Sequence, residues 1–169
     1  MFTRPRIARA FLTALVASAL LFQSATVVHA QNAVHSVAGS GIVQVRSAYS
    51  VPETVARIRA DVASKGIRFF EEIDQAKLAS DAGIKLRPST LLIFGNPPLG
   101  TLFIAANPLA GLDWPVRVLV LEDENGQVWA AYTDFSYIAR RHEVSGADAE
   151  AFAKASGVIA SITSSVAMR

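Results

Sequence analysis

Apolar residues recur along this chain with two different periods, and each period predicts a different element. Over residues 52–65, Val55, Ile58 and Val62 recur at steps of three and four, which places them on one face of an α-helix. Shorter segments rich in β-branched and aromatic side chains have the composition of strands. The predicted strands are residues 42–49, 67–73, 90–94, 116–122 and 128–134. The further predicted helices are residues 75–82, a short segment ending before Pro108, residues 134–138 and residues 146–166.

Turn signals separate these elements and indicate one domain. Gly66 and Gly83 each follow a predicted helix, where glycine is common because it tolerates positive φ. Asn125-Gly126 separates the last two strands and predicts a type I′ hairpin turn with Gly126 at positive φ. The pattern therefore predicts a single α+β domain over residues 41–166. We expect two layers, an antiparallel sheet with helices on one face, and a long C-terminal helix.

Two predicted strands are apolar on both faces. In the strand 90–94, Leu91 and Ile93 point to one face, and Leu92 and Phe94 point to the other. In the strand 116–122, Leu119 and Leu121 point to one face, and Val116, Val118 and Val120 point to the other. A bare second face would expose a larger apolar patch than monomers usually tolerate. A second copy of the chain, a bound apolar ligand or the C-terminal helix would cover it. We expect a homodimer whose interface includes Leu119 or Leu121.

The first thirty residues have the layout of a secretory signal peptide. Three arginines and no acidic residue precede an apolar run at 10–22, and Val28-His29-Ala30 resembles a cleavage site. The apolar run of about 13 residues is shorter than the roughly 20 that span a bilayer. We expect cleavage before Gln31, export to the periplasm or the medium, and no stable membrane anchor afterwards. Residues 31–40 are small and polar and predict a flexible leader.

Charge and cysteine content exclude several classes of function. The chain carries a formal net charge of +2, but removing residues 1–30 leaves 13 basic and 14 acidic residues and a charge of about −1. No basic stripe remains, so we expect no nucleic-acid partner. The chain has no cysteine, which excludes disulfides and thiol catalysis. Only three histidines are present, so we expect neither a metal site nor a cofactor.

Five short motifs between Gly66 and Glu143 carry a family resemblance. They are Phe70-Glu71-Glu72-Ile73-Asp74, Leu86-Arg87-Pro88-Ser89-Thr90, Phe94-Gly95-Asn96-Pro97, Gly111-Leu112-Asp113-Trp114-Pro115 and Arg141-His142. With them the chain resembles bacterial proteins of the domain of unknown function family 302. The resemblance implies a TATA-binding-protein-like fold, a curved antiparallel sheet with helices on one face, often as a dimer. It implies no catalytic activity. The family pattern has a His after the Ile-Asp pair where this chain has Gln75, which cannot titrate near neutral pH.

Four polar residues at or just beyond the ends of predicted strands, together with one histidine, are the candidate ligand-binding residues. They are Asp74, Asn96, Asp113, Arg117 and His142. Asp113 could instead fix its turn, Arg117 is expected to pair internally with a carboxylate, and His142 is expected to be partly exposed at a helix end. Asn96 lies in a Gly- and Pro-rich segment that lacks the Gly-Lys-Ser/Thr ending of a phosphate loop and predicts a rigid turn.

Two functions of different class fit these residues. The first is an exported, non-catalytic module that binds an apolar or amphipathic small molecule, or a protein partner, on its sheet. The alternative is a small hydrolase- or isomerase-like enzyme that uses Asp74 or Asp113 with His142 and Arg117. The enzyme requires His142 within hydrogen-bond reach of a carboxylate in a pocket. We assign no catalytic residue and favour binding.

Overall fold

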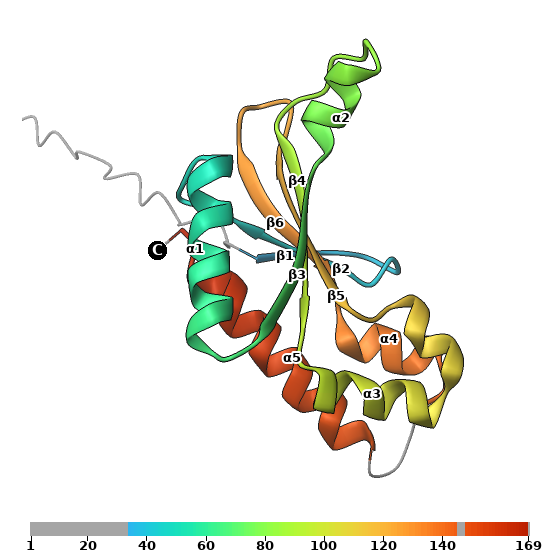
Figure 1. The fold of residues 1–169 in the computed structure, drawn as a ribbon. Coiled ribbons are helices and arrows are strands. Elements are labelled where there is room, and N and C mark those ends of the chain that lie inside the picture. Colours follow the sequence, from blue (N-terminus) through green and yellow to red (C-terminus); the bar gives the residue numbers. More distant parts are fainter. Residues whose placement is uncertain (1–33, 145–147, 169) are drawn as a thin grey trace, which may run out of the picture.

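Six antiparallel strands form one twisted sheet in the computed structural model, which describes residues 34–144 and 148–168 (Figure 1). Their order across the sheet is β1-β2-β6-β5-β4-β3. The strands are β1 (Val34–Val37), β2 (Ile42–Arg46), β3 (Arg68–Asp74), β4 (Ser89–Gly95), β5 (Val116–Glu122) and β6 (Val128–Thr133). The helices are α1 (Val51–Ser64), α2 (Gln75–Asp81), α3 (Pro97–Ala106), the 3₁₀ helix η1 (Pro108–Leu112), α4 (Phe135–Arg141) and α5 (Asp148–Ser164).

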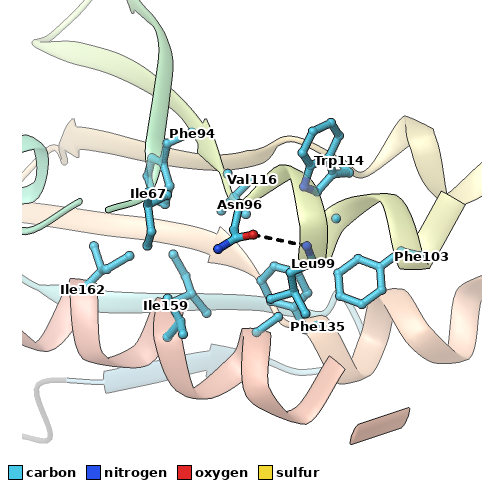
Figure 2. A pocket seen from close by; sticks show the side chains of 14 residues that line it. Ile67, Phe94, Asn96, Leu99, Phe103, Trp114, Val116, Phe135, Ile159 and Ile162 are labelled. Carbon is cyan, nitrogen blue, oxygen red and sulfur yellow. Dashed lines mark hydrogen bonds between the residues drawn. The ribbon is translucent and has the colours of Figure 1, made fainter. Parts of the chain in front are cut away.

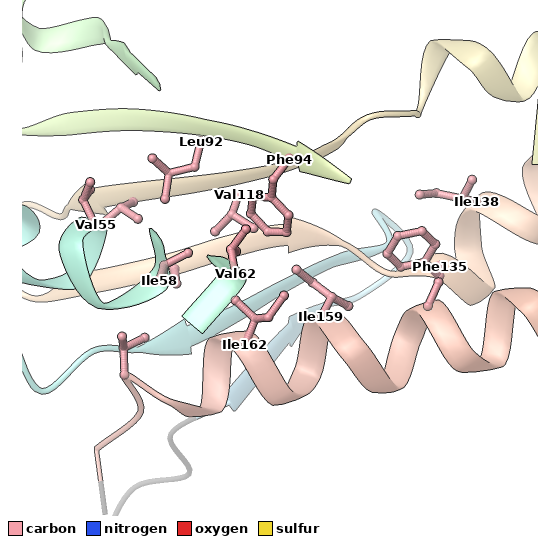
Figure 3. Packing of buried hydrophobic residues seen from close by; sticks show 14 of the residues in the cluster. Val55, Ile58, Val62, Leu92, Phe94, Val118, Phe135, Ile138, Ile159 and Ile162 are labelled. Atoms are coloured by element: carbon pink, nitrogen blue, oxygen red, sulfur yellow. The ribbon is translucent and has the colours of Figure 1, made fainter. Parts of the chain in front are cut away.

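The core lies between one face of the sheet and the helices α1, α3, α4 and α5 (Figure 3). Side chains alternate along a strand, so Leu92 and Phe94 of β4 and Val118 and Val120 of β5 point to this face. The helices bury one apolar row each against these strands, and their most buried members are Ile58, Val62, Phe103, Phe135, Ile159 and Ile162. The predicted α+β class, with a single antiparallel sheet and its helices in one layer, is confirmed.

Local signals explain where α1 begins and ends. The Ser50 side chain accepts a hydrogen bond from the Glu53 backbone N–H at 3.5 Å, and Pro52 occupies the first turn. At the other end, Gly66 has φ +64°, the Gly66 N–H donates to Ala63 O and the Ile67 N–H donates to Val62 O. This pair of bonds is the Schellman arrangement that glycine permits at a helix end.

The structure corrects the sequence-based predictions at the N-terminal side of the domain. Residues 31–40 were expected to be a flexible leader, yet Val34–Val37 forms strand β1 and pairs with β2 from Val34 opposite Val45 to Val37 opposite Ile42. The four β1 side chains are all exposed, so the strand buries no apolar side chain that a pattern could reveal. The predicted signal peptide and its cleavage site lie outside the described residues.

The hairpin between β5 and β6 has a different turn from the one predicted. Gly126 has φ +72°, as expected, but no positive φ occurs at Asn125, and type I′ requires one at both positions. The Gly126 N–H donates to Asp123 O, and the Asp123 N–H donates to Gln127 O. The turn is therefore a longer loop whose last residue, Gly126, is left-handed. The Asp123 carboxylate stabilises this loop, because it accepts hydrogen bonds from the backbone N–H groups of Asn125 and Gln127.

Candidate functional site

Two predicted site residues, 29 positions apart in sequence, meet in a hydrogen bond. His142 Nε2 lies 2.6 Å from Asp113 Oδ2. Both side chains are buried, with 5% and 8% of their surface exposed. His142 was expected to be partly exposed, and that expectation is wrong: it follows α4 as its C-cap, where the chain turns inward. A buried carboxylate needs such partners, since an unpaired one loses its hydration without compensation.

Two arginines complete the cluster around Asp113. Arg117 Nη2 lies 3.4 Å from Asp113 Oδ1 and donates to Leu112 O at 3.0 Å. Arg141 Nη1 lies 3.3 Å from Asp113 Oδ2. Arg117 therefore pairs internally, as predicted. Arg141 was not singled out from the sequence, although its position beside His142 in the Arg141-His142 motif was the signal that could have found it.

The cluster joins segments that are distant in sequence. Asp113 ends η1, Arg117 lies in β5, and His142 follows α4. Asn107, at the start of η1, adds a further tie by donating from Nδ2 to His142 O at 2.9 Å. The polar contacts hold the turn before β5 against the end of α4.

The surroundings of the cluster leave little room for a substrate. The adjoining cavity, which Asp113 and Arg117 line, measures about 20 Å³. That is close to the volume of one water, whereas small-molecule sites span roughly 300–1,000 Å³. His142 thus meets the distance requirement for acid–base chemistry, but the described residues around it enclose a cavity with the volume of about one water. The arrangement of the cluster fits a structural role, in which its polar contacts hold the turn before β5 against the end of α4.

The other two candidate residues lie outside this cluster, and each caps a helix. Asp74 Oδ1 accepts the Lys77 N–H at 2.8 Å at the start of α2. Asn96 Oδ1 accepts the Leu99 N–H at 3.2 Å at the start of α3. The segment after Asn96 continues directly into α3, with both prolines in its first turn, so it forms a helix start and not a phosphate loop.

An apolar hollow lies where β4 runs into α3 (Figure 2). Its volume is about 40 Å³, and its walls come from the end of the sheet, α3 and α5. Trp114 forms one side, where its ring meets Phe70 edge to face with centroids 5.9 Å apart. The indole lies so close to the backbone that a Cβ on Gly100 would fall within 2.5 Å of Trp114 Cδ1. This contact was not predicted, because nothing local in the sequence marks Gly100 as a neighbour of Trp114.

The second face of the sheet carries its own apolar side chains. Leu91 and Ile93 of β4 and Leu119 and Leu121 of β5 point away from the core and are half-buried. Ile73, Trp129 and Ala131 extend this surface over β3 and β6, and we call the seven residues the open sheet face. The C-terminal helix was one proposed cover. However, α5 buries Phe152, Ile159 and Ile162 in the core on the opposite face, so it does not cover the open sheet face.

Within residues 34–144 and 148–168, no group of three or more His, Asp or Glu side chains is placed to hold a metal ion. Over the same residues, none of the helices has both the length and the apolar character needed to cross a membrane.

Comparisons with known proteins relate this chain to others. A region of 122 residues is 38% identical to the "Fluoride-specific ion channel FluC 1" of Brucella suis biovar 1 (strain 1330). It is equally similar to the "Fluoride-specific ion channel FluC 2" of Brucella melitensis biotype 1. The matched region is 72% of this chain and 48% or 45% of those proteins, so the chain spans about half their length.

A solved structure shares the fold. The crystal structure of an uncharacterized conserved protein DUF302 from Bacillus stearothermophilus aligns with a TM-score of 0.68 at 16% sequence identity, over 75% of this chain and 98% of that one. The family model described as "Domain of unknown function DUF302" matches residues 43–162, which begin within β2 and end within α5. The chain therefore belongs to the DUF302 family, a family of unknown function, as its motifs indicated.

Proposed function

We propose that this chain is an exported, non-catalytic binding module whose open sheet face binds a second copy of the chain. The observation that carries the proposal is the apolar character of that face. Four leucine and isoleucine side chains of β4 and β5 gather at its centre, and the helix layer packs on the other side. An apolar patch of this kind, rimmed by polar residues, is typical of an interaction surface.

The charges at the edges of the face support a symmetric partner. Arg46 of β2 aligns with Trp129 and Leu121, near one end of the strands. Glu71 of β3 aligns with Ile93, near the other end of the strands and at the opposite edge of the same face. A two-fold axis that crosses this diagonal brings each Glu71 against Arg46 of the second copy, so the same ion pair forms twice. Such rim pairs add little affinity but select the orientation.

Light scattering at tens of micromolar protein tests the proposal. We expect a dimer for the wild type and a monomer for Leu119→Glu, because a carboxylate at the centre of the interface would be buried without a partner. Leu109→Glu is the matched control, since Leu109 is 65% exposed on η1, away from the sheet, and this variant should remain dimeric. A monomeric wild type would refute the proposal, and native mass spectrometry of that monomer would reveal an apolar ligand if one is the occupant instead.

The relatives suggest a second protein partner. Brucella proteins named as fluoride-specific ion channels carry a region 38% identical to this chain within one polypeptide. Domains joined in one protein often work on the same process, so we propose a channel of that kind as a candidate partner. Deleting the gene for this chain should then lower growth in fluoride-containing medium, and complementation should restore it. Equal growth with and without the gene would remove the channel as a partner.

Export is part of the same proposal. Residues 1–30 have the charge and apolar pattern of a signal peptide, with a small-x-small site before Gln31. N-terminal sequencing of protein recovered from the periplasm or the medium should begin at Gln31. A protein that keeps Met1 and sediments with membranes would show that the segment acts as an anchor.

A further inference from the structure

A cleft opens on the helix side of the sheet, away from the open sheet face. It lies between the first half of α1 and the ends of β3 and β4, where α2 projects beyond the sheet (Figure 1). Its volume is about 720 Å³, within the range of roughly 300–1,000 Å³ found for small-molecule sites. It is much larger than the hollow beside Trp114 or the cavity beside Asp113.

The two walls of this cleft differ in chemistry. The wall from α1 is apolar over Val51, Pro52, Val55 and Ala56, and it ends at Arg59, whose charge is paired with Glu72. The wall from the sheet carries Glu72 and Asp74 on β3 and Thr90 on β4. Asp74 and Thr90 are paired in register, so their side chains stand next to each other on the helix side. A ligand that fits both walls must be amphipathic.

Thr90 marks the point where a ligand would be recognised. Only 9% of its surface is exposed, yet its hydroxyl makes no hydrogen bond with any described residue. Every fully enclosed polar side-chain atom of the described residues has a hydrogen-bond partner. The Thr90 hydroxyl has none, so it is not fully enclosed and water can reach it. A nearly buried hydroxyl in a cleft of this size is a group that a ligand can satisfy.

The charges of the cleft indicate the sign of the ligand. Glu72 is already paired with Arg59, whose Nη1 lies 2.7 Å from Glu72 Oε2. Asp74 uses Oδ1 to cap α2, and no described residue donates to its Oδ2. The unused polar groups of the sheet wall are therefore one carboxylate oxygen of Asp74, which can only accept, and the Thr90 hydroxyl, which can accept or donate. Acceptors of this kind bind a donor, and a carboxylate favours a cationic one.

We propose that this cleft binds a small amphipathic amine, with its ammonium group on Asp74 and Thr90 and its apolar part on α1. The ammonium donates to Asp74 Oδ2 and Thr90 Oγ1, and the hydrocarbon lies along Val51, Val55 and Ala56. The capping role of Asp74 is kept, because the two carboxylate oxygens serve different donors.

Calorimetry and amide NMR with three eight-carbon probes test this proposal at pH 7.5. n-Octylamine is protonated there, n-octanol is a neutral donor, and octanoate is an anion. We expect saturable binding of octylammonium, at least tenfold weaker binding of octanol and no binding of octanoate. The amide shifts should concentrate in α1, β3 and the start of β4.

Variants separate the head-group contacts from the apolar wall. Asp74→Asn keeps an oxygen for the α2 cap but removes the charge, so it should weaken octylammonium at least tenfold and leave octanol within twofold. Thr90→Val should weaken both probes about fivefold, while Thr90→Ser should retain wild-type binding. Ala56→Phe fills the cleft from an exposed helix position and should prevent binding of either probe. Asp81→Asn, on the same helix as the Asp74 cap but outside the cleft, is the matched control and should bind as the wild type.

Three results would overturn the proposal. One is the absence of saturable octylammonium binding at millimolar concentration, and another is octanoate binding as tightly as octylammonium. The third is an equal loss of affinity in Asp74→Asn and Asp81→Asn, which would show that general surface charge causes the attraction.

Discussion

Replacing Gly100 with alanine tests whether the Trp114 contact holds α3 in place. Gly100 is the fourth residue of α3 and is buried. An added Cβ would lie within 2.5 Å of Trp114 Cδ1 and closer still to Nε1 and Cε2, whereas real Cβ atoms essentially never approach within 3.0 Å of another heavy atom. Either the indole or the helix must therefore move. Moving the indole would also disturb its edge-to-face contact with Phe70.

The magnitude follows from two opposing effects. Overfilling a packed site typically costs about 1–3 kcal/mol. Alanine is the better helix former and returns about 0.8–1 kcal/mol. Because the overlap here is with a rigid ring, we expect the upper part of the first range and a net loss of about 1–2 kcal/mol. For a domain of this size that corresponds to a melting temperature lower by roughly 3–8 °C.

Gly157→Ala is the matched control, because Gly157 is also helical but its added Cβ would meet nothing within 4 Å. That variant should gain up to about 1 kcal/mol from helix propensity alone. Urea unfolding followed by tryptophan fluorescence would measure both, and Gly100→Ala should also shift the native emission of Trp114. If Gly100→Ala is as stable as Gly157→Ala, the close approach of Trp114 to α3 is wrong.

Three further predictions concern the hairpin and the buried cluster. Gly126→Val should lower the unfolding free energy by about 1 kcal/mol or more, since φ at Gly126 is +72° and β-branched residues resist that region; an unchanged melting curve would refute it. Asp113→Asn and His142→Ala should each cost about 1–3 kcal/mol, and the double variant less than their sum; additive losses would show that the 2.6 Å contact contributes nothing. The half-exposed arginines beside Asp113 should matter less. Hydrogen bonds from the Trp129 indole and then from the Gln127 N–H hold the pKa of Asp123 below its ordinary value of 3.8. Asp123 therefore stabilises the hairpin above that value, and its contribution is lost as pH falls through the lower folded pKa. Between pH 5 and 2 the stability of Asp123→Asn should fall less than that of the wild type, and parallel pH curves would contradict this.

The sequence by itself determined the helices, the core strands and the class of fold. The spacing of apolar residues and the capping of helices depend on residues that are close in sequence. Ser50 and Gly66 therefore mark the two ends of α1 from local sequence alone. Asp74 and Asn96 show the limit of such patterns, because the sequence placed them at strand ends as candidate ligand-binding residues and the structure shows them as helix caps. The apolar character of both sheet faces was also readable, because side chains alternate along a strand.

The tertiary structure decided which distant residues meet. Asp113 and His142 are neighbours only because η1 and α4 pack at the same end of the sheet, and Gly100 faces Trp114 only because α3 folds back beside the turn before β5. The position of α5 was undetermined for the same reason, since an apolar row fits either face of a sheet that is apolar on both. Strand β1 escaped prediction because its order comes from backbone hydrogen bonds to β2 and not from buried side chains. Local patterns encode conformation, while contacts between distant segments depend on how the whole chain packs.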